Sequence, residues 1–437
     1  MLEISALIEA LKKQLHTIDG EIPTQVTITH PCEVSEVDLL SFLEAQSIFP
    51  NMYWFGREGD EEVVACGAYL LFTHIHHAQT YLSEHPKADY TIWGINGFEP
   101  DRLTKQVEHF YFIPRMELRL QERCLIIRLN LDELGTDVNP IANALVWLEQ
   151  LTPVLAEKKR EFTTTVVASQ HYPEKQGWHD LIEHALTAID DGCFSKVVLA
   201  RKTTYQLQEE LNPLALIKRS KDVNYSCYHF VIRFSQQQAF MGSSPERLFY
   251  RCDEKLMTEA LAGTVASSAD SQERAQLGQW LLNDEKNRRE NQFVVNDIKS
   301  RIELLVTSLE VAPIDIISLR NVQHLVQRIK SKLNYVDDTE CLYQLQPTAA
   351  VAGLPRAPAI EFIIEKEPFS RGWYAGSIGF LSNKRSEFSV SLRSAFVEGN
   401  YLHLYAGAGI VSGSDPDSEW TEIENKAAGL RSLFLEK

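Results

Sequence analysis

The chain has 437 residues, of which 44% are hydrophobic, and 43 Lys and Arg stand against 60 Asp and Glu, a formal charge of −17. This length suits one large domain, or two to three smaller ones with apolar cores. The negative charge argues against nucleic acid or an anionic membrane as the main partner. An anionic substrate then needs a local basic patch or a metal ion.

The cysteines and apolar segments are those expected of a cytoplasmic protein. The seven cysteines are scattered and form no C-x-x-C pair, which is typical of reduced thiols rather than of a disulfide frame or a zinc site. Residues 1–15, MLEISALIEALKKQL, have the periodicity of an amphipathic helix and not of a signal peptide. No uninterrupted apolar run reaches about 18 residues, so no transmembrane helix is expected.

The first half of the chain mixes helical patterns with segments typical of antiparallel strands. We expect helices at 1–17, 34–47, 75–85 and 140–158. We expect strands at 25–30, 51–57, 61–72 and 89–96, with two or three antiparallel strands across 108–130. A seam at 158–177, whose middle has a strand pattern, separates an N-terminal half, 1–160, from a second region, 161–437.

The second half continues in the same mixed style. The patterns predict a helix at 177–190, a strand at 195–207, a short helix, paired strands across 225–251, one long helix from about 271 to 308, and an antiparallel meander over 372–411. Strands do not alternate regularly with helices, so a doubly wound parallel sheet is unexpected. The sequence instead predicts an α+β fold in which large antiparallel sheets pack with flanking helices in a single large domain.

One stretch near the C-terminus, YAGAGIVSGSDPDSEWTEIENK at 405–426, has the features of a ligand site. Small residues around Gly407 allow a backbone to approach a ligand closely. Asp415 has the features of a helix N-cap, and the helix that follows places Glu422 and Lys426 on one face. This arrangement suits a cation-assisted site for a small anion, and an ordinary surface helix with an ion pair is the alternative.

Two further residues are candidates for proton transfer. Lys196 begins the apolar strand KVVLAR, where burial would disfavour its charged form and make it a usable base. Its alternative is a strand-end lysine that extends into water. Glu246 lies in the turn GSSPERL, where a held, protonated carboxyl group can act as a general acid, and the alternative is a carboxylate that caps local N–H groups.

Other polar residues occur in positions suited to a pocket. Gly263 and Thr264 end a strand and can offer a backbone N–H and a hydroxyl to a carboxylate, although a plain turn explains them equally well. Glu290 lies in a helix of mostly solvated charges, and His324 flanks an apolar face, where a core histidine is the simpler explanation. Arg393 interrupts a strand with a burial pattern, and a buried arginine needs an anion.

Together these motifs resemble the chorismate-utilising enzymes, which include isochorismate, salicylate, anthranilate and aminodeoxychorismate synthases. No nucleophile elbow, P-loop or dinucleotide fingerprint competes with this resemblance. The shared segments run in family order over 196–426 and are KVVLAR, SSPERL, ALAGT, DEKNRREN, VQHL, QLQPTAAVAGLPR, WYAGSIG, SLRSA and YAGAGIVSGSDPDSEWTEIENK. The segments YWFGREGDEEVVACGA and YTIWGINGF make the N-terminal half similar to that of isochorismate synthases of menaquinone biosynthesis.

The resemblance implies a Mg²⁺-dependent isomerase that converts chorismate reversibly to isochorismate. It gives Lys196 the role of activating water for attack at carbon 2, and Glu246 that of protonating the carbon-4 hydroxyl as it leaves. It makes Glu290 and Glu422 the Mg²⁺ ligands. The positions it places in the chorismate pocket are Gly263, Thr264, His324, Tyr374, Arg393, Gly407 and Lys426. Tyr374 and Arg393 are expected at the enolpyruvyl carboxylate, and Lys426 near the ring carboxylate.

Departures from some family members narrow the expected activity. Ala262 stands where one class of aminodeoxychorismate synthases has a nucleophilic lysine, and Lys196 is present where anthranilate synthases lack the water-activating lysine. The tryptophan-feedback motif of anthranilate synthases is absent from the first half. Water is therefore the expected nucleophile, no glutaminase subunit is expected, and we expect a monomer or a weak homodimer.

Three alternatives stay open from the sequence. A salicylate synthase uses the same pocket and then eliminates pyruvate, and only the N-terminal resemblance argues against it. An isochorismate synthase can also feed siderophore rather than menaquinone synthesis. A catalytically idle chorismate-binding relative is disfavoured because Lys196, Glu246, Glu290 and Glu422 are all present.

Overall fold

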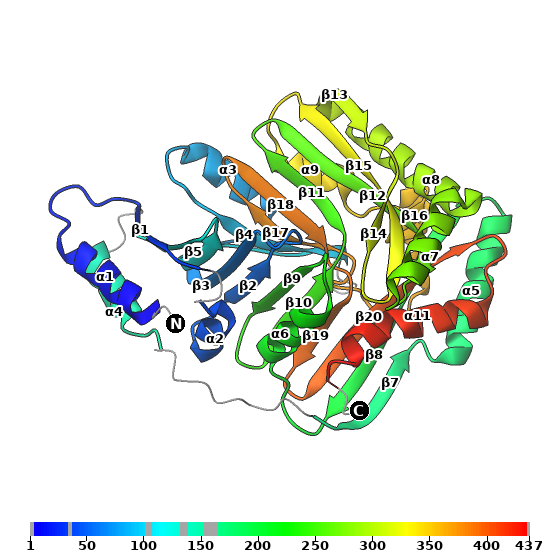
Figure 1. The fold of residues 1–437 in the computed structure, drawn as a ribbon, viewed down its shortest axis with the longest axis horizontal. Coiled ribbons are helices and arrows are strands. Elements are labelled where there is room, and N and C mark those ends of the chain that lie inside the picture. Colours follow the sequence, from blue (N-terminus) through cyan, green and yellow to red (C-terminus); the bar gives the residue numbers. More distant parts are fainter. Residues whose placement is uncertain (1–3, 34–36, 101–106, 132–138, 153–163, 435–437) are drawn as a thin grey trace.

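The computed structural model describes residues 4–33, 37–100, 107–131, 139–152 and 164–434 (Figure 1). The elements of the first half are α1 (Ile4–His16), β1 (Gln25–Pro31), α2 (Leu39–Ala45), β2 (Asn51–Phe55), β3 (Glu61–Phe72), α3 (Ile75–Glu84), β4 (Ile92–Pro100), β5 (Val107–Gln121), β6 (Cys124–Asn130) and α4 (Pro140–Leu148).

The second half begins with β7 (Val166–Tyr172), α5 (Lys175–Asp190), β8 (Lys196–Leu207), α6 (Pro213–Val223), β9 (Tyr228–Arg233), β10 (Gln238–Ser244), β11 (Arg247–Cys252), β12 (Lys255–Ala266), α7 (Ser271–Asn283) and α8 (Glu285–Ile302). It continues with the 3₁₀ turn η2 (Glu303–Leu305), β13 (Val306–Val311), β14 (Asp315–Ser318), β15 (Val322–Leu333), α9 (Asp338–Leu345), β16 (Gly353–Leu354) and α10 (Arg356–Lys366). The last elements are β17 (Ser377–Leu381), β18 (Arg385–Val390), β19 (Ser394–Glu398), β20 (Tyr401–Val411) and α11 (Pro416–Arg431).

The predicted α+β class is confirmed, and two predicted elements need correction. The long helix expected from 271 to 308 is two helices, because Asp284 is extended and ends α7 while its carboxylate accepts the Asn287 N–H as the N-cap of α8. Helical structure then stops before 306, where β13 begins. The helix expected at 140–158 ends at Leu148 as α4, and residues 153–158 lie outside the described part of the chain.

The strands form two antiparallel branches that meet at the long strand β5. One branch passes by hydrogen bonding from β1 through β6, β5, β3, β2, β9, β10, β19 and β20 to β8, with β7 and β16 on its last edge. The other leaves β5 through β4 and continues through β17, β18, β11, β12 and β15, with β13 and β14 on the outer edge. A strand at a branch point lets one chain build two sheets without breaking the hydrogen-bond ladder.

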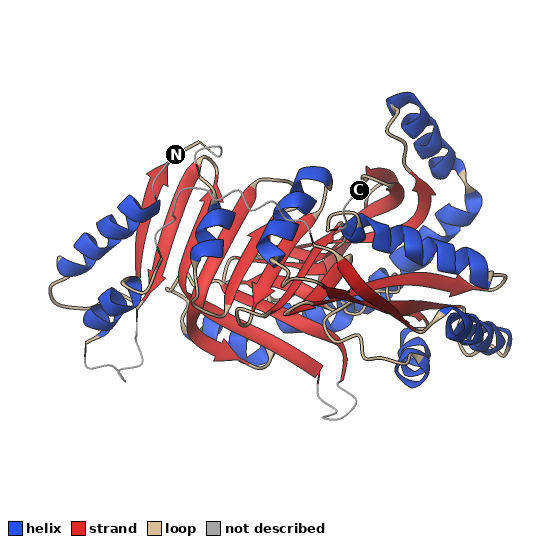
Figure 2. Cartoon of the chain, turned by 90° about the horizontal axis from the view of Figure 1, so that it is seen from below, coloured by secondary structure: helices blue, strands red, loops and turns tan. Residues whose placement is uncertain are grey.

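The inner faces of the two branches share an aromatic core. Trp54 on β2 and Tyr228 on β9 pack with Trp93 on β4 and Phe380 on β17, with ring centroids 5.0–6.4 Å apart. All four side chains are almost completely buried. Helices lie outside the sheets, with α11 along β20 and α8 along β12 (Figures 1 and 2). Burying large aromatic surfaces between sheets supplies much of the folding free energy of such an arrangement.

Hydrogen-bonded strands join the two halves of the chain. β2 pairs with β9 in the register Trp54↔Phe230, and β4 pairs with β17 in the register Gly94↔Gly379. The predicted boundary at residue 160 falls outside the described residues. No described helix is long and apolar enough to cross a membrane, and all seven cysteines are free thiols.

Candidate active site

Lys196 lies at the end of the longest ladder in the second half of the chain. It is the first residue of β8 and is paired with Val411 of β20 on one side and Leu354 of β16 on the other. The residue is only 8% exposed, and its Nζ lies 2.9 Å from Oε1 of Glu290 on α8. The lysine is therefore buried and bonded to a carboxylate instead of extending into water.

Glycines of β20 provide the floor on which two predicted site residues lie. A Cβ atom at Gly409 would approach the Lys196 Cε to 3.1 Å, and one at Gly407 would approach the Tyr374 hydroxyl to 2.8 Å. The Tyr374 ring stacks on Tyr405 of the same strand, with centroids 5.1 Å apart and planes at 11°. Burial raises the pKa of Tyr374 to about 12, so its hydroxyl remains a hydrogen-bond donor at neutral pH. The close approach expected near Gly407 is thus made by side chains.

Glu246 is held in the turn between β10 and β11. The residue is 3% exposed, and its Oε1 accepts a hydrogen bond of 3.2 Å from the Thr348 hydroxyl. Burial, reinforced by the negative charge of Glu259, raises the pKa of Glu246 to about 8. The side chain is therefore mostly protonated at neutral pH, which is the form that can donate a proton.

Gly263 and Thr264 lie where β12 departs from its regular register with β15. Gly263 has a φ of +85°, a backbone conformation that disfavours other residues, and the Thr264 N–H donates to Oδ1 of Asn287 on α8. The Thr264 hydroxyl lies 2.9 Å from Nδ1 of His324, its register partner on β15. This irregularity connects the strand pair to the helix that carries Glu290.

Positive charge gathers around His324. Burial, reinforced by the nearby Arg393 and Lys426, lowers the pKa of His324 to about 3, so the imidazole is neutral. Arg393 has a φ of +47°, and among the described residues we find no hydrogen bond or ion pair to its guanidinium group. Burial lowers the pKa of this arginine as well, although an arginine keeps its charge at neutral pH. A half-buried guanidinium group without a partner among the described residues is suited to bind an anion.

The helix α11 contributes Lys426 and Glu422. Asp415 caps the helix as predicted and accepts the Ser418 N–H. Lys426 Nζ lies 2.6 Å from Glu422 Oε1 and donates to the Gly407 carbonyl at 3.0 Å. The expected ion pair is present and exposed, and the contact with Gly407 connects it to the floor of the site.

Comparison with known proteins identifies the family of this chain. The model of the chorismate binding enzymes matches residues 12–434.

The chain belongs to the chorismate-binding enzymes.

Its full-length similarity is to the isochorismate synthase members. The chain is 45% identical to isochorismate synthase MenF of Escherichia coli, over 99% of both chains, and 36% identical to that of Haemophilus influenzae over 99% and 97%. The solved menaquinone-specific isochorismate synthase of Escherichia coli superposes with a TM-score of 0.92 over 98% of this chain and 99% of that one. Anthranilate synthase component I of Streptococcus pneumoniae, at 19% identity and a TM-score of 0.68, shares the fold.

Two carboxylates fit the Mg²⁺ site that the family resemblance implies. Glu290 and Glu422 are 39% and 49% exposed at their side chains, and each is paired with a lysine. Carboxylate oxygens are ligands that Mg²⁺ prefers. Burial raises the pKa of Glu419 on the same helix, and the charge of Glu422 adds to this rise. Within the described residues no three metal-binding side chains already converge.

Sequence reasoning missed the residues that surround the Glu246 carboxyl group. Thr348, Glu259 and Arg57 all lie close to it, and Arg57 comes from the first half of the chorismate-binding fold. The only local signal was Glu259 in the strand pattern TEALAGT. Charged residues are rarely buried without a partner, so a glutamate in a buried strand indicates a nearby cation.

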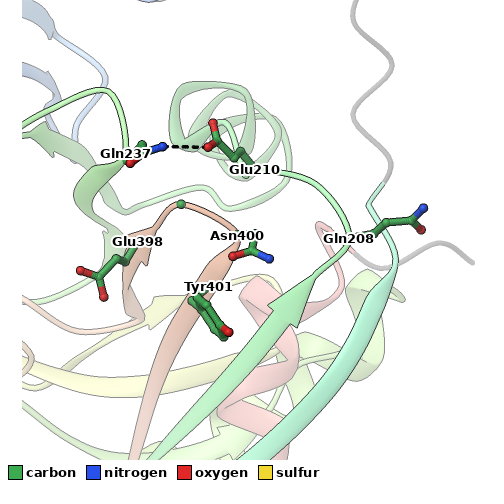
Figure 3. A pocket seen from close by; sticks show the side chains of 7 residues that line it. Gln208, Glu210, Gln237, Glu398, Asn400 and Tyr401 are labelled. Carbon is green, nitrogen blue, oxygen red and sulfur yellow. Dashed lines mark hydrogen bonds between the residues drawn. The ribbon is translucent and has the colours of Figure 1, made fainter.

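A separate cavity of about 450 Å³ lies at the opposite end of the β8–β20 ladder (Figure 3). Its lining is Gln208, Glu210, Gln237, Glu398, Gly399, Asn400 and Tyr401. Gln237 donates to Glu210 at 3.0 Å, which satisfies these two polar groups. None of the residues that align with the chorismate-binding motifs lines this cavity.

Proposed function

We propose that the chain is an isochorismate synthase that interconverts chorismate and isochorismate, an isomerase feeding menaquinone biosynthesis. The observation that carries the proposal is that a buried lysine, Lys196, and a buried carboxyl group with a raised pKa, Glu246, face one site in a family whose full-length relatives are isochorismate synthases. We further propose that it acts in the cytoplasm, without a glutaminase subunit, as a monomer or weak homodimer.

The proposed substrate carries two carboxylates, and the site offers groups to match them. Arg393, which lacks an ionic partner among the described residues, and the Tyr374 hydroxyl are proposed to bind the enolpyruvyl carboxylate. Lys426 is proposed to bind near the ring carboxylate, with Thr264 and the neutral His324 beside it. Charge-assisted hydrogen bonds of this kind fix the ring relative to the two proton-transfer groups.

The proposed reaction adds water at carbon 2 and removes the hydroxyl group from carbon 4. Neutral Lys196 takes a proton from a water molecule as its oxygen bonds to carbon 2, and the ring double bond shifts. The bond between carbon 4 and its hydroxyl breaks, and Glu246 supplies the proton that makes this group water. The lysine ends charged and the glutamate ionised, and proton exchange with solvent restores both. In the reverse direction the two residues exchange acid and base roles.

Glu290 and Glu422 are the residues proposed to hold Mg²⁺. When bound, the ion would neutralise a substrate carboxylate and withdraw electrons from the ring as the hydroxyl leaves. In this proposal Lys196 and Glu246 transfer protons, whereas Glu290 and Glu422 would hold the ion that neutralises charge.

Purified enzyme incubated with chorismate provides the test. We expect isochorismate to form with Mg²⁺ present, and chelator or Glu422→Gln to abolish turnover. Salicylate formation at a rate comparable to isochorismate formation would identify a salicylate synthase, and chorismate binding without either product an idle relative. Full activity in metal-free buffer would contradict the metal site, and unchanged metal dependence in Glu290→Gln would remove Glu290 from it.

A further inference from the structure

The backbone around Glu246 is held on both sides by one buried ion pair. Arg57 donates from Nη1 to the carbonyl of Pro245, the residue before Glu246, at 2.8 Å. Oε1 of Glu259 accepts the N–H of Arg247, the residue after Glu246, at 3.0 Å. Arg57 and Glu259 bind each other through two hydrogen bonds, of which that from Nη2 to Oε2 measures 3.0 Å.

This pair is thoroughly removed from solvent. The side chains of Arg57 and Glu259 are 6% and 2% exposed. Arg57 also lies over the Tyr228 ring, with 5.6 Å between its guanidinium carbon and the ring centroid. A buried bidentate pair has a preferred geometry, and it transmits that geometry to the backbone groups it binds.

The two members of the pair come from distant parts of the chain. Arg57 follows β2 in the N-terminal half, whereas Glu259 lies on β12, 202 residues later. β2 is itself hydrogen-bonded to β9, which places the turn after β2 beside the turn that carries Glu246 (Figure 1). The N-terminal half thus reaches the turn of the proposed acid through Arg57, and Glu58 adds a contact to Arg247.

We propose that Arg57 and Glu259 form a positioning pair for Glu246, fixing the turn that carries it and keeping a negative charge beside its carboxyl group. The inference rests on the proposed function, since it assigns Glu246 the role of acid. Neither residue touches the reacting atoms, so both act through Glu246.

The charges around Glu246 determine the direction in which loss of Glu259 should shift the pKa of Glu246. Besides Glu259, the charged groups that face it are Lys196 from β8 and Arg57, and Thr348 contributes a hydroxyl. Glu259 favours the protonated form of Glu246, while the two cations and the hydroxyl favour the ionised form. Removing the charge of Glu259 therefore lowers the pKa of Glu246, and the acid loses its proton at a lower pH.

The experiment compares four variants of the full-length enzyme: Glu259→Gln, Arg57→Met, Arg57→Lys, and the double variant Arg57→Met/Glu259→Gln. In Glu259→Gln the alkaline limb of the kcat/KM profile should move to lower pH by about one unit. In Arg57→Met kcat should fall about tenfold with little change in KM, because the acid is misplaced and the substrate is not. Arg57→Lys should recover part of that loss.

The double variant separates a pair from two independent residues. If the two act together, it should be no slower than the slower single variant. Asp338→Asn is the matched control, because Asp338 on α9 and Arg251 on β11 form another buried bidentate pair, at 2.6 and 2.8 Å. It should lower thermal stability and leave the pH profile unchanged.

Three results would overturn the inference. An alkaline limb that stays in place in Glu259→Gln, losses that multiply in the double variant, or an equal shift in Asp338→Asn would each do so. Glu246→Gln is measured in parallel. If it is as active as the wild type, the proposed function fails together with this inference. An inactive Glu246→Gln beside unaffected Arg57 and Glu259 variants overturns the inference alone.

Discussion

The two ends of the β8–β20 ladder differ in the way their polar groups are satisfied. At one end Lys196 is buried against Gly409 and paired with Glu290 across to α8. At the other end, about 30 Å away along the strands, the cavity of Figure 3 is lined mostly by exposed polar side chains, of which Gln237 and Glu210 bond to each other.

This difference shows that the volume of a cavity does not indicate whether the residues around it can carry out chemistry. The cavity end has space, but the titratable residues that line it are all exposed. The lysine end has a cation without an ionic partner, Arg393, and a carboxyl group that keeps its proton, Glu246. Groups held in such environments cost folding free energy, and this cost is typical of sites that bind and transform charged substrates.

Replacing Lys196 tests the contrast with the largest expected effect. Lys196→Ala should lower kcat by about 10²–10⁴ and leave chorismate binding largely intact, because it removes the base that activates water. Glu210→Ala, at the cavity end, should retain wild-type kinetics. Steady-state assays of both variants check this, and a comparable loss in Glu210→Ala would break the distinction between the two ends. Ammonium salts giving an amino product as fast as hydration would refute water as the nucleophile.

Glu246→Gln should slow interconversion from both pure isomers by a similar factor, toward the lower end of about 10²–10⁴. Gln keeps the shape and the Thr348 hydrogen bond but has no transferable proton. Wild-type kcat/KM should fall as pH rises through about 8, where the carboxyl group ionises. Approach to equilibrium from each isomer measures the effect. A near-wild-type rate would mean that Glu246 only caps its turn.

The same variant has a predicted effect on stability of opposite sign. The folded state binds the Glu246 proton more tightly than the unfolded state, so wild-type stability falls as pH rises from about 4.5 to about 8. Gln cannot ionise and escapes this loss. The melting temperature of Glu246→Gln relative to the wild type should therefore rise across this window, and a constant difference would show that the carboxyl group is not protonated in the folded enzyme.

Arg393→Met should raise KM for chorismate about 10- to 100-fold, as expected for loss of a charged hydrogen-bonding partner. Thermal stability should stay the same or increase, because we find no anion paired with this half-buried guanidinium in the described protein. Arg251→Met is the contrasting variant, since it removes a cation with a protein partner and should destabilise the fold. A strongly destabilised Arg393→Met would identify a structural role.

Two glycines, one at each end of the ladder, give the smallest and most local test. Gly409→Ala adds a Cβ atom 3.1 Å from the Lys196 Cε and should lower kcat about tenfold by displacing the amine. Gly399→Ala, in the turn at the cavity end, has free space but a φ of +59°, and should cost about 1 kcal/mol of stability with no loss of activity. Kinetics and thermal unfolding of both variants should show opposite signatures.

What the sequence predicted and what it missed follow from the distance between partners. The N-cap Asp415 and the helical spacing of Glu422 and Lys426 are local features, and the structure has them as predicted. The contact of Lys196 with Glu290 spans 94 residues, and the bond of Arg57 to Glu259 spans 202. A local hydrophobic periodicity therefore cannot predict either contact. Such contacts exist only once both sheet branches have formed.

Other misses had a readable cause. The alternation VQRIKSKL marks most of β15, yet its many charges conceal a strand that is buried on one face only. The charge density around Asp284 likewise concealed a helix N-cap inside what reads as one helix. The roles of Glu290 and Glu422 as metal ligands, and of the pocket residues toward chorismate, remain predictions that the variants above address.

The strand pairs β2–β9 and β4–β17 have a consequence for where the chain can be divided. A fragment confined to the second half would present β9 and β17 as open edges, with rows of unpaired N–H and C=O groups. Open edges of apolar strands recruit other chains, and the exposed faces of Phe230 and Phe380 would strengthen that tendency. All the residues aligned with the catalytic motifs lie in that fragment, but on this account it would aggregate before it could act. The first half of the chain prevents this because β2 and β4 cover the edges of β9 and β17.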